Sequence, residues 1–140
     1  MAEPEFEFPI RIYWEDTDAG GIVFYANYLK FFERARTEWL RARGIEQQAL
    51  REQVGGLFVV TETGVRYRQP ARLDDELLVT ARLERAGRAA LNLIQHAYLK
   101  TPAGTRGPLL CDADIRIGWV DAATLRPARI PPTLLQRLTP

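Results

Sequence analysis

Residues 27–43 read NYLKFFERARTEWLRAR, and the apolar side chains in this stretch recur every three or four positions. This spacing is that of an amphipathic helix, with one apolar face and one charged face. The apolar face comprises Tyr28, Phe31, Phe32, Ala35, Trp39 and Ala42. Gly44 follows as a natural stop signal for such a helix. The sequence therefore predicts one long helix whose wide aromatic face has to be buried against another layer.

Outside this helix the sequence alternates between apolar and polar residues, a pattern typical of half-buried strands. The strands expected on this basis span residues 6–14, 57–68, 77–84, 91–99 and 109–119. In the first of them the buried phase comprises Phe6, Phe8, Ile10, Ile12 and Trp14. Gly64 is expected to mark a β-bulge in the second strand. Short helices are expected over residues 46–53 and 131–138.

The order of these elements predicts the fold class. Consecutive strands joined by short turns pair antiparallel, and a single aromatic helix has to cover their sheet. We therefore expect an α+β fold in which one curved antiparallel sheet is wrapped around a long central helix. Such a sheet has open edges and an outer face, which favours pairing with a second copy of the chain.

The composition excludes several classes of function. Of the 140 residues, 19 are Lys or Arg and 18 are Asp or Glu, so the chain has no positive excess for nucleic acid. It contains no apolar run of about 18 residues, so no integral membrane segment is expected. The acidic start, MAEPEFEFP, does not resemble a secretory signal. These features predict a single cytoplasmic domain over residues 1–140.

The chain contains one cysteine, Cys111, and one histidine, His96. A disulfide or a thiolate metal cluster therefore cannot form within one chain, and no metal site is expected. A catalytic triad would have to be built around His96, which has no acidic residue at short spacing. We expect both residues to be structural parts of their strands, with Cys111 in the core.

The most unusual segment is residues 15–23, EDTDAGGIV, where two carboxylates directly precede glycines and the predicted helix. A calcium loop is excluded, because counting from Asp16 places Gly20 and Asn27 at two ligand positions. One interpretation is a structural turn, since Asp and Gly are turn formers. The other is catalytic: the helix start would polarise a carbonyl oxygen, while Asp18 attacks the carbon or deprotonates a water. That chemistry is acyl transfer or hydrolysis without serine, cysteine or histidine.

Three stretches together resemble one known family. They read YWEDTDAGGIVFYANY (residues 13–28), FFERARTE (residues 31–38) and YRQPARLDD (residues 67–75). These motifs are similar to those of the 4-hydroxybenzoyl-CoA thioesterase-like family, and most of all to its YbgC-type acyl-CoA thioesterases. The resemblance covers roughly residues 8 to 130 and implies the hotdog fold. It is specific for family and fold, and much less so for substrate.

The resemblance implies roles for individual residues. Asp18 matches the catalytic carboxylate of the family, as nucleophile or general base, and Asp16 matches a companion acid that supports the loop. Tyr25 falls where a backbone N–H at the helix start polarises the thioester carbonyl. Many YbgC-type members carry histidine at that position, whereas the benzoyl-type enzymes carry tyrosine. The tyrosine here weakens the assignment to one branch and leaves the chemistry intact.

Other residues are expected at the substrate. The resemblance places Asp16, Gly21, Ile22 and Val23 among the substrate-binding residues. Arg85 and Arg88 lie at a predicted turn, where cations could hold the phosphates of CoA, although a solvated surface also explains them. One end of the aromatic helix face is a candidate lining for an acyl pocket. For Glu33 and Arg36, within the helix motif, we expect structural roles.

The function expected from these observations is hydrolysis of an acyl-CoA thioester to a free acid and CoA. No cofactor is expected, because CoA is part of the substrate. The family resemblance also implies a homo-oligomer, either dimer or tetramer, with active sites between protomers. Two alternatives stay open: a non-catalytic acyl-CoA-binding or scaffold protein of the same fold, and a hydratase or dehydratase, which the lone His96 disfavours. The acyl group itself is not readable from the sequence.

Overall fold

The long helix α1 spans Asn27–Arg41, as the spacing of its apolar residues predicts. It belongs to a computed structural model that describes residues 5–139. The strands are β1 (Phe6–Arg11), β2 (Gly56–Tyr67), β3 (Glu76–Ala86), β4 (Ala90–Lys100) and β5 (Arg106–Asp121). The shorter helical segments are the 3-10 turn η1 (Trp14–Asp16), α2 (Gln47–Ala49), the π-helical turn η2 (Leu50–Val54) and α3 (Pro132–Leu138). The predicted single domain also includes residues 1–4 and 140, which lie outside the described residues.

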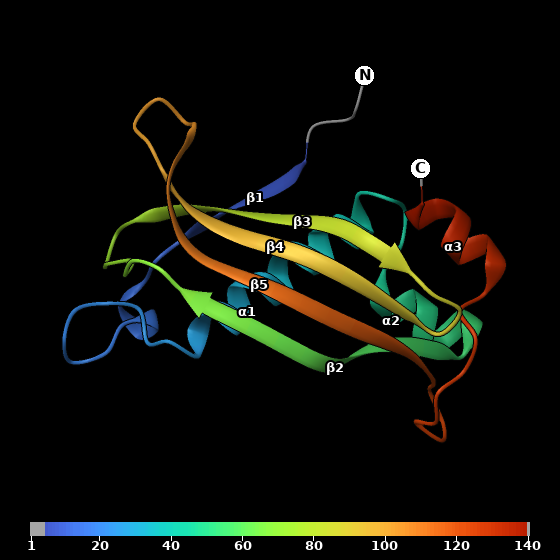
Figure 1. Cartoon of the computed structure of the whole chain (residues 1–140). Coiled ribbons are helices and arrows are strands. Elements are labelled where there is room, and N and C mark those ends of the chain that lie inside the picture. The colour runs from blue at the N-terminus through green and yellow to red at the C-terminus, as the bar shows by residue number, and fades with distance from the viewer. Residues whose placement is uncertain (1–4, 140) are drawn as a thin grey trace.

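The five strands form one antiparallel sheet in the order β1-β3-β4-β5-β2. Figure 1 shows this curved sheet lying across one side of α1, with α2 and α3 near one end and the loop after β1 at the other. The predicted α+β arrangement is therefore confirmed. Strands β1 and β2 are its two edges. No helix among residues 5–139 is both long enough and apolar enough to span a membrane.

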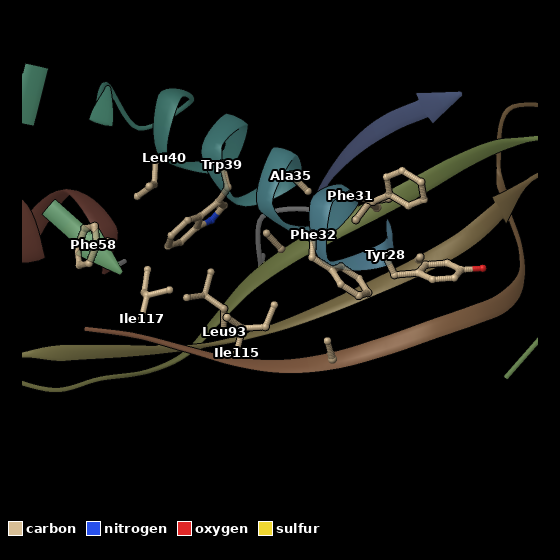
Figure 2. Close-up of a cluster of buried hydrophobic side chains, with 14 of the residues drawn as sticks. Tyr28, Phe31, Phe32, Ala35, Trp39, Leu40, Phe58, Leu93, Ile115 and Ile117 are labelled. Atoms are coloured by element: carbon tan, nitrogen blue, oxygen red, sulfur yellow. The ribbon is translucent and has the colours of Figure 1, made fainter. Parts of the chain in front are cut away.

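The core lies between α1 and the inner face of the sheet (Figure 2). Phe31, Phe32 and Ala35 are fully buried, because the apolar face of α1 turns toward the strands. The strands contribute alternate residues, among them Leu93, Ile115 and Ile117. Burying one large apolar side chain contributes about 1.5–3 kcal/mol, so this helix face is a principal source of stability. Cys111 lies in the same core, as predicted.

The prediction for Trp14 is wrong. Its side chain is 80% exposed, although the alternating pattern places it in the buried phase of the first strand. Strand β1 ends at Arg11, and the chain then turns into η1. The turn forms because the Asp16 carboxylate accepts the N–H of Tyr13 at 2.8 Å. Because of this bond, Trp14 lies in the turn and not in the strand, and its side chain faces solvent.

The β-bulge of β2 lies at Thr61, and the predicted position at Gly64 is wrong. Gly64 pairs regularly with Asp114, whereas the register shifts between Val60 and Glu62. The Thr61 hydroxyl donates to the carbonyl of Arg116 at 3.3 Å. The Thr61 methyl lies above Gly118, where an added Cβ would approach it to 3.1 Å. The glycine that makes room for the bulge is thus Gly118 on the neighbouring strand β5, so the sequence pattern of β2 alone could not predict it.

Candidate active site

A short hairpin connects η1 to the start of α1. Thr17 and Val23 form an isolated antiparallel bridge, and the N–H of Asp18 donates to the carbonyl of Ile22 at 2.9 Å. Gly21 at the tip has a φ of +78°, a left-handed conformation that glycine adopts without strain. The hairpin thereby presents its tip to solvent and returns the chain to the helix.

The two carboxylates of this segment are held differently. Asp16 is buried, and its carboxylate is bound to the N–H of Tyr13. Asp18 is exposed, and its Oδ1 accepts the N–H of Gly20 at 2.8 Å. Within residues 5–139 the second oxygen of Asp18 accepts no hydrogen bond. Asp18 therefore keeps one carboxylate oxygen without a hydrogen bond, whereas Asp16 stabilises the loop that carries Asp18.

The carbonyl oxygen of Asp16 joins this loop to the helix start. It accepts the N–H of Phe24 at 3.0 Å and the side-chain amide of Asn27 at 2.8 Å. No side chain in the described part of the chain caps α1, and its first turn contains no acidic residue. The N–H groups of Asn27 and Leu29 donate to the carbonyls of Phe24 and Ala26, but those of Tyr25 and Ala26 have no acceptor among the described residues. These two groups and the positive end of the helix dipole thus remain available to an external oxygen.

Tyr25, at the helix start, is held by aromatic neighbours. Its carbonyl accepts the hydroxyl of Tyr67 at 3.0 Å, and the two rings meet edge to face at 6.1 Å. Tyr67 also meets Tyr28, whose hydroxyl accepts the N–H of Ala71 at 3.2 Å. Burial raises the pKa of Tyr67 above its ordinary value, so its hydroxyl stays protonated and donates. The side chain of Tyr25 itself is 63% exposed.

Sequence reasoning missed the role of Tyr67. Forty-two positions separate it from Tyr25, and local spacing carries no signal for such a pair. Its place in the stretch of residues 67–75, which resembles the family, was the one available indication.

The other residues expected at the substrate fall into two groups. Gly21 is exposed, and Ile22 is half-buried and bridged to Arg72, so both lie at the surface of the hairpin. Val23 belongs to the core, and its N–H donates to the carbonyl of Ala71 at 2.9 Å. Val23 therefore holds the hairpin against the core.

Arg85 and Arg88 lie far from Asp18 within one chain. Strand β3 begins at Glu76, beside the loop that follows β1, and ends before Arg88. An eleven-residue strand is about 35 Å long, so the arginines occupy the opposite end of the sheet. There the carbonyl of Arg88 accepts the N–H of Ile130 at 2.7 Å. The structure does not bring them together with Asp18.

His96 also lies apart from Asp18. Its neighbours along β4, Gln95 and Ala97, are fully buried beneath α1, so alternation directs His96 to the outer face of the sheet. Its ring lies 3.1 Å from the hydroxyl of Tyr98. Asp112 on β5 pairs with it in register, but that carboxylate is bound to Arg66 and Arg68. The imidazole–carboxylate pair of a hydratase is thus not formed with Asp18 or with Asp112.

Comparisons with known proteins show the family of the chain. The model of the Thioesterase-like superfamily matches residues 12–138. The chain belongs to this superfamily. The acyl-CoA thioesterase YbgC of Haemophilus influenzae is 38% identical over 131 residues, which cover 94% of this chain and 92% of that protein. The acyl-CoA thioesterase YbgC of Helicobacter pylori is 32% identical and covers 86% of this chain and 90% of its own.

Solved structures of the superfamily share the fold. A probable thioesterase from Bartonella henselae superposes with a TM-score of 0.82 at 30% identity, covering 91% of this chain and 100% of its own. A 4-hydroxybenzoyl CoA thioesterase mutant complexed with 4-hydroxybenzoyl CoA superposes with a TM-score of 0.86 at 20% identity, covering 95% and 97%. The expected hotdog fold and the resemblance to YbgC-type thioesterases are confirmed. The chain is a thioesterase.

Proposed function

We propose that this thioesterase hydrolyses acyl-CoA, with Asp18 as the reacting carboxylate and the start of α1 as the site for the thioester oxygen. The observation that carries the proposal is the pairing of an exposed carboxylate with an uncapped helix start. Asp16 ties the two together through its main-chain carbonyl. The names of the relatives at 38% and 32% identity support acyl-CoA as substrate.

In the proposed reaction the thioester oxygen accepts hydrogen bonds from N–H groups near Tyr25. Negative charge that develops on this oxygen is then stabilised by the helix dipole. Asp18 either attacks the carbonyl carbon, giving a mixed anhydride that water cleaves, or takes a proton from an attacking water. In both routes the carbon–sulfur bond breaks, CoA leaves as a thiolate that takes up a proton, and a carboxylic acid is released. The proposed reaction uses no cofactor, because residues of the chain carry it out and CoA is part of the substrate.

The test is release of CoA thiol from a panel of short, long and aromatic acyl-CoAs. We expect Asp18→Asn to lower kcat by about 10²–10⁴ if the carboxylate is a general base, and by more if it is the nucleophile. Asp74→Asn is the matched control, because Asp74 is an exposed aspartate on a separate turn with a left-handed backbone that asparagine tolerates. Equal activity of wild type and Asp18→Asn would overturn the assignment.

A single turnover in ¹⁸O-labelled water tests for the covalent route. Label in the Asp18 carboxylate after one turnover would identify a mixed anhydride that water cleaves at the Asp18 carbonyl. Label only in the released acid would show that water attacks the acyl carbon, either of the thioester itself or of the anhydride. If wild type binds acyl-CoA but releases no thiol, the chain is a binding or scaffold protein of the same fold.

The proposal includes a homo-oligomer, dimer or tetramer. Both sheet edges are open in one chain, and Val60 on the edge strand β2 is 50% exposed. Unpaired edges of this kind favour pairing with another copy. Light scattering combined with activity at increasing dilution tests this point, and full activity in a monomer would overturn it. A cytoplasmic location belongs to the same proposal, supported by the single cysteine of the chain, which allows no intrachain disulfide.

A further inference from the structure

A cavity of about 240 Å³ lies beneath the C-terminal half of α1, apart from the Asp18 hairpin. Its apolar wall consists of Trp39, Leu40, Phe58 and Ile117, whose side chains surround one end of the core in Figure 2. Val60, a half-exposed residue on the edge strand β2, also lines it. An apolar cavity of about 150 Å³ accommodates benzene, so this one has room for a ring or a short chain.

Arg36 also lines this cavity. Arg36 is only 9% exposed, and no carboxylate within residues 5–139 lies within salt-bridge distance of it. Burial lowers the pKa of Arg36, while the charge of Glu33 acts in the opposite direction, but an arginine remains protonated. A buried cation without an anionic partner is costly, and native proteins pair such charges.

One hydrogen bond orients the Arg36 side chain. Its Nη1 donates to Oε1 of Gln95 at 3.0 Å. Gln95 is held in turn, because its Nε2 donates to the carbonyls of Phe32 at 2.9 Å and Thr80 at 3.1 Å. A guanidinium has five N–H donors, so most of those on Arg36 have no acceptor among the described residues. No fully enclosed side-chain nitrogen of the described residues lacks a partner, so the Arg36 nitrogens without an acceptor are not fully enclosed, and Arg36 lines the cavity.

The other polar residues that line the cavity, Glu33, Thr37 and Gln47, are bound to one another. Gln47 donates to the hydroxyl of Thr37 at 3.0 Å, and Thr37 donates to the carboxylate of Glu33 at 3.1 Å. Glu33 is exposed and does not reach the guanidinium of Arg36. The interior thus combines one fixed cation with an apolar wall.

We propose that this cavity binds an organic carboxylate with a small apolar body, the carboxylate being held by the guanidinium of Arg36. A carboxylate matches the paired donors of a guanidinium and supplies the missing negative charge. The apolar body of the ligand lies against Trp39 and Phe58. The carboxylate has two possible sources: a free carboxylic acid, or the far end of a dicarboxylic acyl group, of which the second rests on the proposed function.

The test is an NMR titration of ¹⁵N-labelled protein with hexanoate and benzoate, matched by the neutral hexanamide and benzamide. We expect the carboxylates to shift the Nε–H signal of Arg36 and the indole signal of Trp39, and to bind about 10–100 times more tightly than the amides. Arg36→Met should lose this preference, whereas Arg34→Met, on the exposed side of the same helix, should keep it.

Two results would overturn the proposal: amides that bind as tightly as carboxylates, or an Arg36→Met variant that binds hexanoate like wild type. Should Arg36→Met fail to fold, the carboxylate–amide comparison on wild type still decides. The titration needs no turnover, so it is independent of Asp18 and of the proposed hydrolysis.

Kinetics distinguish the two sources. If the ligand is the far end of an acyl group, Arg36→Met should raise KM for adipoyl-CoA and leave KM for hexanoyl-CoA, which has the same chain length, unchanged. If it is a free acid, both KM values should stay unchanged while hexanoate binding is lost.

Discussion

The main-chain carbonyl of Asp16 and the side-chain amide of Asn27 are joined by a hydrogen bond of 2.8 Å. This bond connects the loop that carries the reacting carboxylate to the first residue of α1. It holds the two halves of the proposed site in one geometry.

Asn27→Ala should therefore lower activity by disturbing the position of the Asp18 loop relative to the start of α1. The expected loss of stability is about 1 kcal/mol, the usual contribution of one hydrogen bond. We expect kcat for acyl-CoA to fall about tenfold, since catalysis requires the reacting groups within a narrow geometry. Arg34→Ala, at an exposed position of the same helix, is the control. An unchanged kcat in Asn27→Ala would show that the bond does not position the site.

Tyr67→Phe removes a hydroxyl and leaves a ring. The ring contacts with Tyr25 and Tyr28 persist, so stability should change by less than about 0.5 kcal/mol. The carbonyl of Tyr25 loses its donor, and the helix start becomes less fixed. We expect kcat to fall about three- to tenfold. Tyr98→Phe, which removes a hydroxyl on the outer sheet face, should leave kcat unchanged; an equal loss in both variants would contradict the positioning role.

Two glycines of β2 should respond oppositely to alanine. At Gly56 an added Cβ would lie 2.2 Å from Cζ2 of Trp119, so the indole has to move. We expect Gly56→Ala to lower the free energy of unfolding by about 1–3 kcal/mol, measured by urea denaturation. At Gly64 nothing lies within 4 Å of the added Cβ, so Gly64→Ala should be neutral or slightly stabilising. Equal effects at both positions would contradict the close contact with Trp119.

Much of the fold was predictable from the period of apolar residues. Alternation identified all five strands, and helical spacing identified α1, because burial on one face requires that period. Trp14 and the bulge at Thr61 were not predictable. The first depends on the Asp16 carboxylate capturing a nearby N–H, and the second on a glycine in a different strand.

The candidate site was predictable in part. Asp16 and Asp18 are the same residue type two positions apart, and only the folded loop shows which is bound and which is free. The bond between Tyr67 and Tyr25 links distant segments, so local patterns contain no sign of it. Arg36 was expected to be structural because it lies within the helix motif of the family, but its burial and its bond to Gln95, 59 positions away, have no local signal in the sequence.

Asp112 should make stability depend on pH. Burial acts to raise its pKa, but hydrogen bonds from Arg68 and Arg66 outweigh burial, so the pKa lies below its ordinary value. A lowered folded-state pKa stabilises the protein fully above the unfolded pKa of about 3.9, and this stabilisation is lost as the pH falls through the folded pKa.

At pH 7 we therefore expect Asp112→Asn to cost about 1 kcal/mol, a low value because both arginines are half exposed. Urea denaturation should show that the difference in free energy of unfolding between wild type and Asp112→Asn disappears below pH 4. Asp114→Asn, at an exposed carboxylate, should cost less than about 0.5 kcal/mol at either pH. If Asp112→Asn were still less stable than wild type in acid, the loss of stability would not come from the charge of Asp112.

Cys111 should be inert in the folded protein. Burial, followed by the negative charge of Asp112, raises the pKa of its thiol to about 12, so the reactive thiolate is scarce at pH 8. The side chain is also fully buried beneath α1. We expect no reaction with a disulfide dye in native buffer and one equivalent of reaction in guanidinium chloride, with Cys111→Ala as the blank. Rapid labelling of the native protein would contradict this burial, whereas an inert thiol means that colour in the thiol-release assay comes from CoA alone.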